Sequence, residues 1–248
     1  MGLQGDQVTL FLSGQDVPIP ECNIIIHQPT LKQIALFKES NFLLAVNLFS
    51  DIGRNAEKIR QNHPMIDQFS DFDILMALIN QDQGLQDSVQ KFFQLVFPRY
   101  NIDINDTEIR FLEEDRCVGI VHSRNYISFI ETIKNLFLLP TKRTDYDPAN
   151  EKAAAIAEKF KKRKEILAKM KNKDESTVSL FGSYASILSI GMHIDINTIW
   201  NYTPFQLYDS FNRYWHKNSS DFYQRVSTMP MMDTSKMEEP EPWTDGLY

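Results

Sequence analysis

The chain has 248 residues, a hydrophobic fraction of 42%, nine glycines and a formal net charge of −7. This hydrophobic fraction is enough to form a core, which argues against global disorder, and the shortage of glycine argues against an all-β fold rich in tight turns. The acidic balance argues against a general nucleic-acid-binding role, because phosphate binding needs a cationic surface, although one local basic patch remains compatible with it.

The first forty residues predict two short strands followed by a helix. The polar start Met1–Gln7 lacks a basic region followed by an apolar one, so no signal peptide is expected. Val8–Leu12 predicts a strand, and Asn23–His27, with three consecutive isoleucines, predicts a second strand that can pair with it as a hairpin. Pro29 suits the first turn of a helix over Thr30–Phe37.

Helices are expected to dominate the next stretch of the chain. Ser70, followed three residues later by Asp73, resembles an N-cap with an acidic N3 residue ahead of apolar residues at helical spacing. Leu85–Phe97 predicts a further helix, which Pro98 ends. The longest apolar runs, such as Leu43–Phe49, are far too short to span a membrane.

Alternating apolar and polar residues from Ile102 to His122 form the strongest β signal in the chain. The pattern predicts a hairpin or three-strand unit with Glu113–Arg116 as a loop, after which Tyr126–Leu139 returns to helix. Carboxylates can bind calcium or magnesium, but the spacing in this unit matches no EF-hand loop, so a solvated acidic loop is preferred. The carboxylates are Asp103, Asp106, Glu108, Glu113, Glu114 and Asp115.

A polar stretch, residues 141–150, is the best candidate for a linker. Pro148–Lys173 then predicts a long helix with an apolar seam at heptad spacing, and Thr177–Met192 predicts a second helix. Glu151–Lys173 holds nine Lys or Arg and three Glu, which gives a local net charge of 9 − 3 = +6. A solvated basic face around the seam is preferred over phosphate binding, and pairing with the acidic C-terminus is a further alternative.

The C-terminal part combines an aromatic helix with an acidic tail. Thr203 is a good N-cap, and Pro204 suits the first helical position. Asp233–Asp245 holds five acids and one Lys, a local net charge of 1 − 5 = −4, so residues 229–248 are expected to be a disordered acidic tail. Trp243 and Leu247 interrupt its polarity, either by chance or as a segment that docks in a groove on a partner.

Together these elements predict a mainly α fold with a small β hairpin or three-strand unit, of the α+β class, with a C-terminal half that resembles a helical bundle. The expected organisation is a mixed α/β domain over residues 1–140, a linker over 141–150, a helical domain over 151–228 and the tail over 229–248.

Motifs for catalysis or cofactor binding are absent from the sequence. No two of the five histidines lie four residues apart, and no glycine-rich nucleotide loop is present. His193 and Asp195 are better explained as a capped turn than as metal ligands. Cys22 and Cys117 are too few for a disulfide framework, which indicates a reducing compartment, and both lie in predicted apolar strands as buried, inert thiols. We therefore expect no enzymatic activity, cofactor or bound metal.

Three stretches resemble uncharacterised structural-module proteins of tailed phages that infect Gram-positive bacteria. The first runs from Phe11–Ile19 into Ile26–Ile34, the second is Ile199–Phe211, and the third is the acidic end with Trp243 and Leu247. Such proteins look like tail assembly chaperones or baseplate-hub assembly factors, which hold tail components before incorporation. The resemblance leaves the middle of the chain without a match.

The resemblance implies a non-enzymatic phage tail or baseplate assembly factor that acts by protein–protein interaction in the host cytoplasm. Its partners would be other phage structural proteins; neither a membrane nor nucleic acid is expected as a partner, and homo-oligomerisation is left open. The candidate partner-binding residues are Leu207, Tyr208, Phe211, Tyr214, Trp215, Trp243 and Leu247. Two alternatives remain, a permanent virion structural subunit and a nucleic-acid-binding accessory protein that uses the basic helix over residues 151–173.

Overall fold

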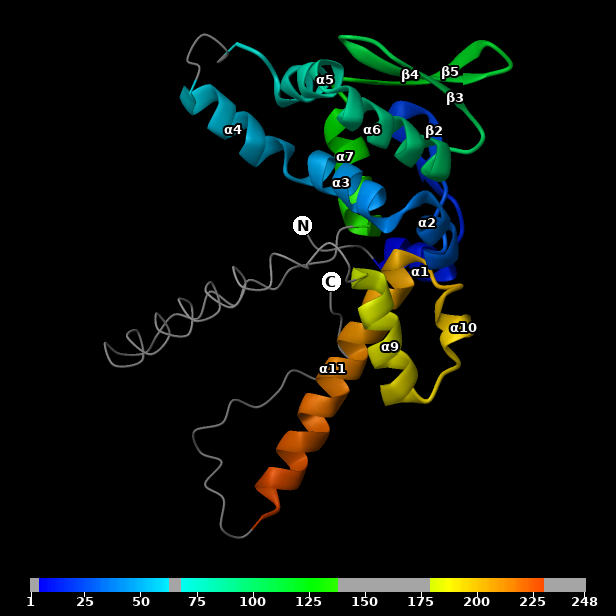
Figure 1. The fold of residues 1–248 in the computed structure, drawn as a ribbon, viewed down its shortest axis with the longest axis vertical. Helices are drawn as coiled ribbons and strands as arrows, with labels where there is room; N and C mark the ends of the chain where they lie inside the picture. The colour runs from blue at the N-terminus through cyan, green and yellow to red at the C-terminus, as the bar shows by residue number, and fades with distance from the viewer. Residues whose placement is uncertain (1–4, 63–67, 138–178, 230–248) are drawn as a thin grey trace. The chain divides into compact units, whose positions relative to one another are not determined.

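The computed structural model describes residues 5–62, 68–137 and 179–229 of the chain (Figure 1). Contacts divide the chain into two units, one formed by Met1–Leu139 with Tyr184–Tyr248 and the other by Pro140–Ser183. The expected linker over 141–150, the basic helix over 151–173 and residues 230–248 of the tail lie outside the described residues.

Helices make up most of the described chain, and the prediction of a mainly α fold with a small β part is confirmed. The elements are α1 (Gly5–Ser13), β1 (Val17–Ile19), the 3-10 turn η1 (Pro20–Cys22), β2 (Ile24–Ile26), α2 (Leu31–Phe37), α3 (Glu39–Ser50), α4 (Ile52–Asn62), α5 (Asp71–Gln81), α6 (Gln83–Val96), β3 (Asn101–Ile104), β4 (Glu108–Glu113), β5 (Arg116–His122), α7 (Tyr126–Phe137), α9 (Leu180–Met192), α10 (Ile196–Ile199) and α11 (Pro204–Ser227). Within the described ranges, no helix is both long enough and apolar enough to cross a membrane.

Two antiparallel sheets are formed by strands that are close in sequence. β3, β4 and β5 pair in chain order, with a bulge between Phe111 and Leu112, so the predicted three-strand unit is confirmed. The other sheet pairs β1 with β2. The strand predicted over Val8–Leu12 is wrong, because these residues form part of α1, whose Phe11 is buried against Phe205 of α11. Burial against a distant helix decided the conformation of this segment, and strand propensity did not.

Phenylalanine rings form the centre of the core. α3 packs against α6 and α7, and the rings of its Phe42 and Phe49 meet rings from both helices. The rings of Phe97 and Phe111, whose centroids are 4.9 Å apart, join β4 to the same cluster. Its members are Phe42, Phe49, Phe92, Phe93, Phe97, Phe111, Phe129 and Phe137, all of them buried. Such ring pairs add about 0.5–1.5 kcal/mol each beyond the area they bury.

A close approach at Gly119 joins the two sheets. A Cβ at this position of β5 would lie 2.3 Å from Ile24 Cγ2 and 2.7 Å from the carbonyl oxygen of Cys22. Asn23, which has a left-handed φ of 54°, donates a hydrogen bond from Nδ2 to the carbonyl oxygen of Val118 at 2.6 Å. Only glycine fits here, because some of the atoms that a side chain would meet belong to the backbone, and a change of rotamer cannot move them.

The structure agrees with the sequence-based prediction at one helix start and differs from it at another. Ser70 and Asp73 form a reciprocal capping box at the start of α5, as predicted. Pro29 does not occupy a first helical turn, because Thr30 is the N-cap of α2 and its side chain accepts a hydrogen bond from the amide of Gln33. The helix therefore begins at Leu31, one residue after the cap.

The two cysteines have different surroundings. Cys22 is buried in η1, where burial and, secondarily, the Glu21 carboxylate raise the pKa of its thiol to about 12. Cys117 lies on β5 but is exposed, so the expectation of a buried thiol is wrong there. The first two residues of β5 are both exposed, since the strand enters the core only from Gly119 onward.

Candidate functional site: an apolar groove on α9 and α11

The first turn of α11 is held by the N-terminal part of the chain. Thr203 and Gln206 form a capping box, which confirms Thr203 as the N-cap and Pro204 as the first helical residue. The amides of Leu31 and Lys32, at the start of α2, donate hydrogen bonds of 2.9 and 3.0 Å to the carbonyl oxygens of Tyr202 and Trp200. The first amides of a helix have no acceptor within that helix. For two amides at the start of α2, the loop that leads into α11 supplies the acceptors.

Gln206 serves two helices at once. Its Oε1 accepts a hydrogen bond from the amide of Thr203, and its Nε2 donates to the carbonyl oxygen of Leu12, near the end of α1, at 2.7 Å. Beside it, the rings of Phe11 and Phe205 meet edge to face with centroids 5.2 Å apart. These contacts fix where α11 starts and the direction in which it leaves the core.

α9 and α11 run side by side in the same direction, because the chain returns through α10 between them (Figure 1). The ring of Tyr184 meets those of Phe211 and Tyr208, with centroids 4.5 and 6.5 Å away. At Gly191 a Cβ would lie 2.2 Å from Cζ of Tyr214, so the absent side chain leaves the space that this ring fills. Aromatic packing thus joins α9 to the N-terminal half of α11.

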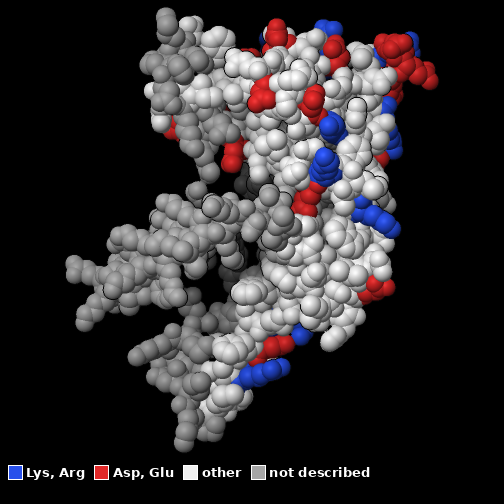
Figure 2. Space-filling view, viewed as in Figure 1, with Lys and Arg blue, Asp and Glu red and all other residues white. Residues whose placement is uncertain are grey.

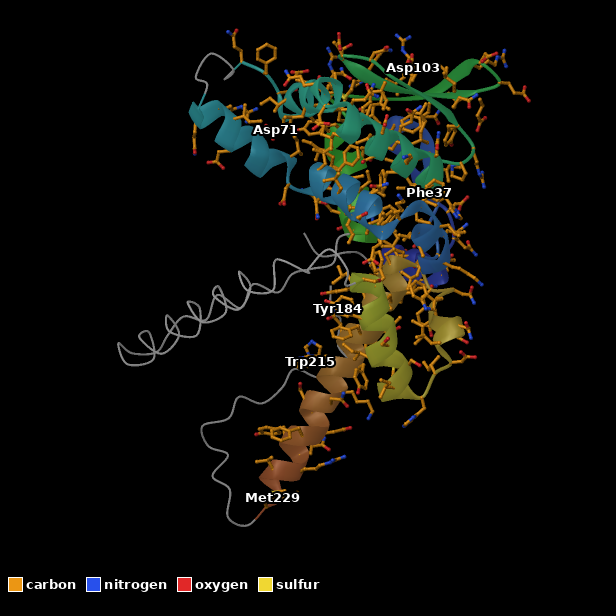
Figure 3. The ribbon with its side chains drawn as sticks, viewed as in Figure 1. Phe37, Asp71, Asp103, Tyr184, Trp215 and Met229 are labelled. Atoms are coloured by element: carbon orange, nitrogen blue, oxygen red, sulfur yellow. The ribbon has the colours of Figure 1, made fainter. Side chains whose placement is uncertain are left out.

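An apolar hollow of about 370 Å³ opens on these helices, and we call it the α9–α11 groove. Its most exposed large side chains are Trp215 and Phe222, with 62% and 61% of their surface accessible (Figure 3 labels Trp215). The groove is lined by Ile187, Phe211, Tyr214, Trp215, Asn218, Ser219 and Phe222. Ile190 and Met192 of α9 add further exposed apolar surface. Contiguous exposed apolar surface of this kind marks interaction sites more often than isolated apolar residues do.

A seven-residue spacing places the exposed residues of α11 on one face. Trp215 and Phe222 are both large, apolar and more than 60% exposed. Seven residues fall only about 20° short of two full helical turns, so these two positions lie nearly in line. Met229, 49% exposed, follows two residues after the end of the helix. α11 continues as a single helix through Asn218-Ser219-Ser220. The aligned face is therefore a continuous stripe.

The predicted partner-binding residues occupy three different settings. Leu207 is fully buried and offers no surface, and Tyr208, Phe211 and Tyr214 are partly buried against α9. Trp215 is exposed, whereas Trp243 and Leu247 lie outside the described residues. Ile187 and Phe222 belong to the groove but were missing from the prediction. The spacing of Phe222 from Trp215 was a signal in the sequence, whereas Ile187 is placed there by tertiary packing.

Few charges surround the groove. Asp209 is buried on α11, and both of its carboxylate oxygens accept from Nε of Arg213 at 3.1 Å. Lys217 and Asp221 form an exposed pair at 2.9 Å. On the face shown in Figure 2, charged side chains gather mainly near the three-stranded sheet and its neighbouring helices, while the part formed by α9 and the start of α11 is mostly white. The groove lining therefore suits apolar side chains of an occupant.

A second hollow, of about 830 Å³, lies beside α5 and the turn between β3 and β4. Both of its carboxylates have partners: Asp73 caps α5, and Asp106 accepts a hydrogen bond from Nδ2 of Asn80 at 2.8 Å. Most of the remaining lining is apolar, including Ile74 and Leu78. Nothing in this arrangement combines a nucleophile with a base.

Potential metal ligands are dispersed over the described residues, and no group of three or more His, Cys, Asp or Glu side chains there is able to hold a metal ion. Asp195 is the N-cap of α10 and accepts from the amide of Asn197, which confirms the predicted capped turn. Nδ1 of His27 lies 2.8 Å from Asp16, which also binds Arg99 at 2.8 Å, so this cluster links three separate segments of the fold.

In the comparison with known proteins, a family model matches the part of the chain that contains these helices. Residues 170–247 match the family model described as the YomV second domain. This part of the chain is similar to a phage-associated domain. The matched range contains α9, α10, α11 and the groove between them. No curated protein and no solved structure matches the chain.

Proposed function

We propose that the protein is a non-enzymatic assembly factor of a tailed phage, and that it holds a tail or baseplate component in the α9–α11 groove within the host cytoplasm. The observation that carries the proposal is an exposed apolar groove inside the range that matches a phage-associated domain. Apolar side chains as exposed as Trp215 and Phe222 gain free energy when a partner covers them.

The geometry also favours transient binding of a partner. The groove is small, and its aromatic residues stand on helices that are anchored at the start of α11. A rigid aromatic anchor contributes affinity without a large cost of ordering side chains. Release of the component on incorporation would then need only the loss of a few contacts.

The test measures binding of purified tail and baseplate proteins of the parent phage, one at a time, by calorimetry. Replacing both Trp215 and Phe222 with Asp should remove two anchors and weaken binding by about 2 kcal/mol or more, roughly 30-fold. Leu36→Asp and Ile127→Asp are matched controls, because these residues are 83% and 57% exposed on α2 and α7. The proposal fails if the double variant binds as wild type does, or if the controls weaken binding equally.

A permanent virion subunit is the alternative that this proposal must exclude. Quantitative mass spectrometry of purified phage particles separates the two roles. An assembly factor should be scarce in mature particles and abundant in infected cells, whereas a subunit should be present in the particles at a fixed copy number.

A further inference from the structure

The α9–α11 groove occupies the part of α11 from Phe211 to Phe222, close to the C-terminal end of the helix. Trp215 and Phe222 are more than 60% exposed there, and Met229, the last described residue, is 49% exposed just after the end of the helix. Apolar side chains of this size are ordinarily covered, either by their own chain or by a partner. The chain continues directly from Met229.

Nineteen residues follow Met229, since 248 − 229 = 19. Trp215 lies 229 − 215 = 14 residues before Met229, which is about 21 Å along a helix at 1.5 Å per residue. Trp243 lies 243 − 229 = 14 residues after Met229, and an extended chain of that length covers up to about 46 Å. The following segment is therefore long enough for Trp243 to reach any point of the groove.

The composition of residues 230–248 complements the groove. Trp243 and Leu247 are large apolar residues in a segment with five acids and one Lys, a net charge of 1 − 5 = −4. Between Trp215 and Met229, α11 carries Lys217 and Arg225 against Asp221, a net charge of 2 − 1 = +1. The segment also contains three prolines, which reduce the conformational freedom lost when an extended peptide binds.

The comparison with known proteins supports the same pairing independently. The match to the YomV second domain begins before α9 and continues to residue 247, so it includes both the groove and the segment with Trp243 and Leu247. A single domain model that spans both indicates that the segment belongs to the domain and is not an unrelated extension.

We propose that residues 230–248 dock in the α9–α11 groove of their own chain, with the indole of Trp243 packed between Trp215 and Phe222. The docked segment covers the apolar stripe until a client displaces it. Docking itself does not depend on the proposed function, whereas the competition with a client rests on it. A groove covered for nine-tenths of the time would bind a client about tenfold more weakly than an open groove.

The experiment uses the full chain labelled with 5-fluorotryptophan, which gives one fluorine signal for each of Trp200, Trp215 and Trp243. Docking predicts that Phe222→Ala shifts the Trp243 signal, and that Leu247→Ala shifts the Trp215 signal. Ile127→Ala, on the distant surface of α7, is the control and should shift neither. A Trp243 signal at the position of an unfolded peptide, unchanged by Phe222→Ala, would overturn the proposal.

Dilution distinguishes docking within one chain from docking between copies. If the segment docks within its own chain, Phe222→Ala should shift the Trp243 signal equally over a hundredfold dilution of a monomer identified by light scattering. A shift that is lost with dilution means that a second copy is the occupant. Client binding then tests the linked proposal separately. Trp243→Ala with Leu247→Ala should raise client affinity about tenfold. Lowered affinity would mean that the segment contacts the client instead, and coupling without any client binding would refute only the assembly function.

Discussion

Replacing Gly119 with Ala tests whether the two sheets depend on the close approach between β5 and η1. The new methyl would lie 2.3 Å from Ile24 Cγ2, 2.7 Å from the Cys22 carbonyl oxygen and 2.9 Å from that of Asn23. Two of these atoms are backbone, so a rotamer change cannot relieve the clash and β1–β2 must move away from β5.

The magnitude follows from three contributions. Overpacking of this kind costs about 1–3 kcal/mol, and moving the turn endangers the hydrogen bond from Asn23 to Val118, worth about 1 kcal/mol. Alanine has less conformational entropy than glycine in the unfolded chain, and this difference offsets about 0.5–1 kcal/mol of the loss in stability. We expect a net loss of about 2–3 kcal/mol, which lowers the melting temperature by roughly 5–10 °C for a fold of this size.

Urea unfolding monitored by circular dichroism measures this loss. Gly53→Ala is the control, because its Cβ would meet only Asp71 Oδ2 at an ordinary 3.6 Å, and alanine favours the helix by up to about 1 kcal/mol. The two substitutions should therefore have opposite signs. Ile24 is buried, so Ile24→Ala alone should cost about 2–5 kcal/mol, and rescue is measured against that single variant. In the Ile24→Ala background, Gly119→Ala should cost less than in wild type but should still destabilise the fold, since the carbonyl contacts remain. Wild-type stability of Gly119→Ala, or complete rescue, would refute the reasoning.

Three further predictions concern the groove, the thiols and the anchor of α11. Gly191→Ala should displace the Tyr214 ring and weaken client binding measured by calorimetry, while leaving the far-ultraviolet circular dichroism unchanged. A maleimide at pH 8 should label Cys117 rapidly and Cys22 slowly by mass spectrometry, because burial raises the pKa of Cys22 to about 12. The unfolded thiol ionises at a lower pH, so above about pH 9 wild type should lose stability relative to Cys22→Ala. Gln206→Ala should cost about 1–2 kcal/mol in urea unfolding, because both the capping box and the bond to α1 are lost.

Local signals in the sequence were sufficient for features that local chemistry determines. The capping boxes at Ser70 and Thr203 were predictable because each needs only side chains within one turn. The strands from Ile102 to His122 were predictable because alternation survives in strands that pair with their neighbours in sequence. Features that depend on contacts between distant parts of the chain were not predictable from local sequence.

Distance along the chain explains the main errors. Val8–Leu12 is helical because Phe11 packs on Phe205, a partner 194 residues away in sequence. The groove needs Ile187 of α9 beside Trp215 of α11, and no periodicity within either helix indicates that pairing. The stripe of Trp215 and Phe222, in contrast, was readable from their spacing of seven residues.

The hydrogen bonds from the first turn of α2 to the loop before α11 have a consequence for synthesis on the ribosome. The amides of Leu31 and Lys32 emerge early, but their acceptors, Tyr202 and Trp200, follow 202 − 31 = 171 and 200 − 32 = 168 residues later in the sequence. Because domains generally complete folding only when their interacting segments are available, the N-terminal helices complete these contacts only after the loop before α11 has been synthesised. A nascent or prematurely terminated chain that ends before α10 would expose Phe11 and these amides, and would thereby be distinguishable from a finished protein by quality-control proteases.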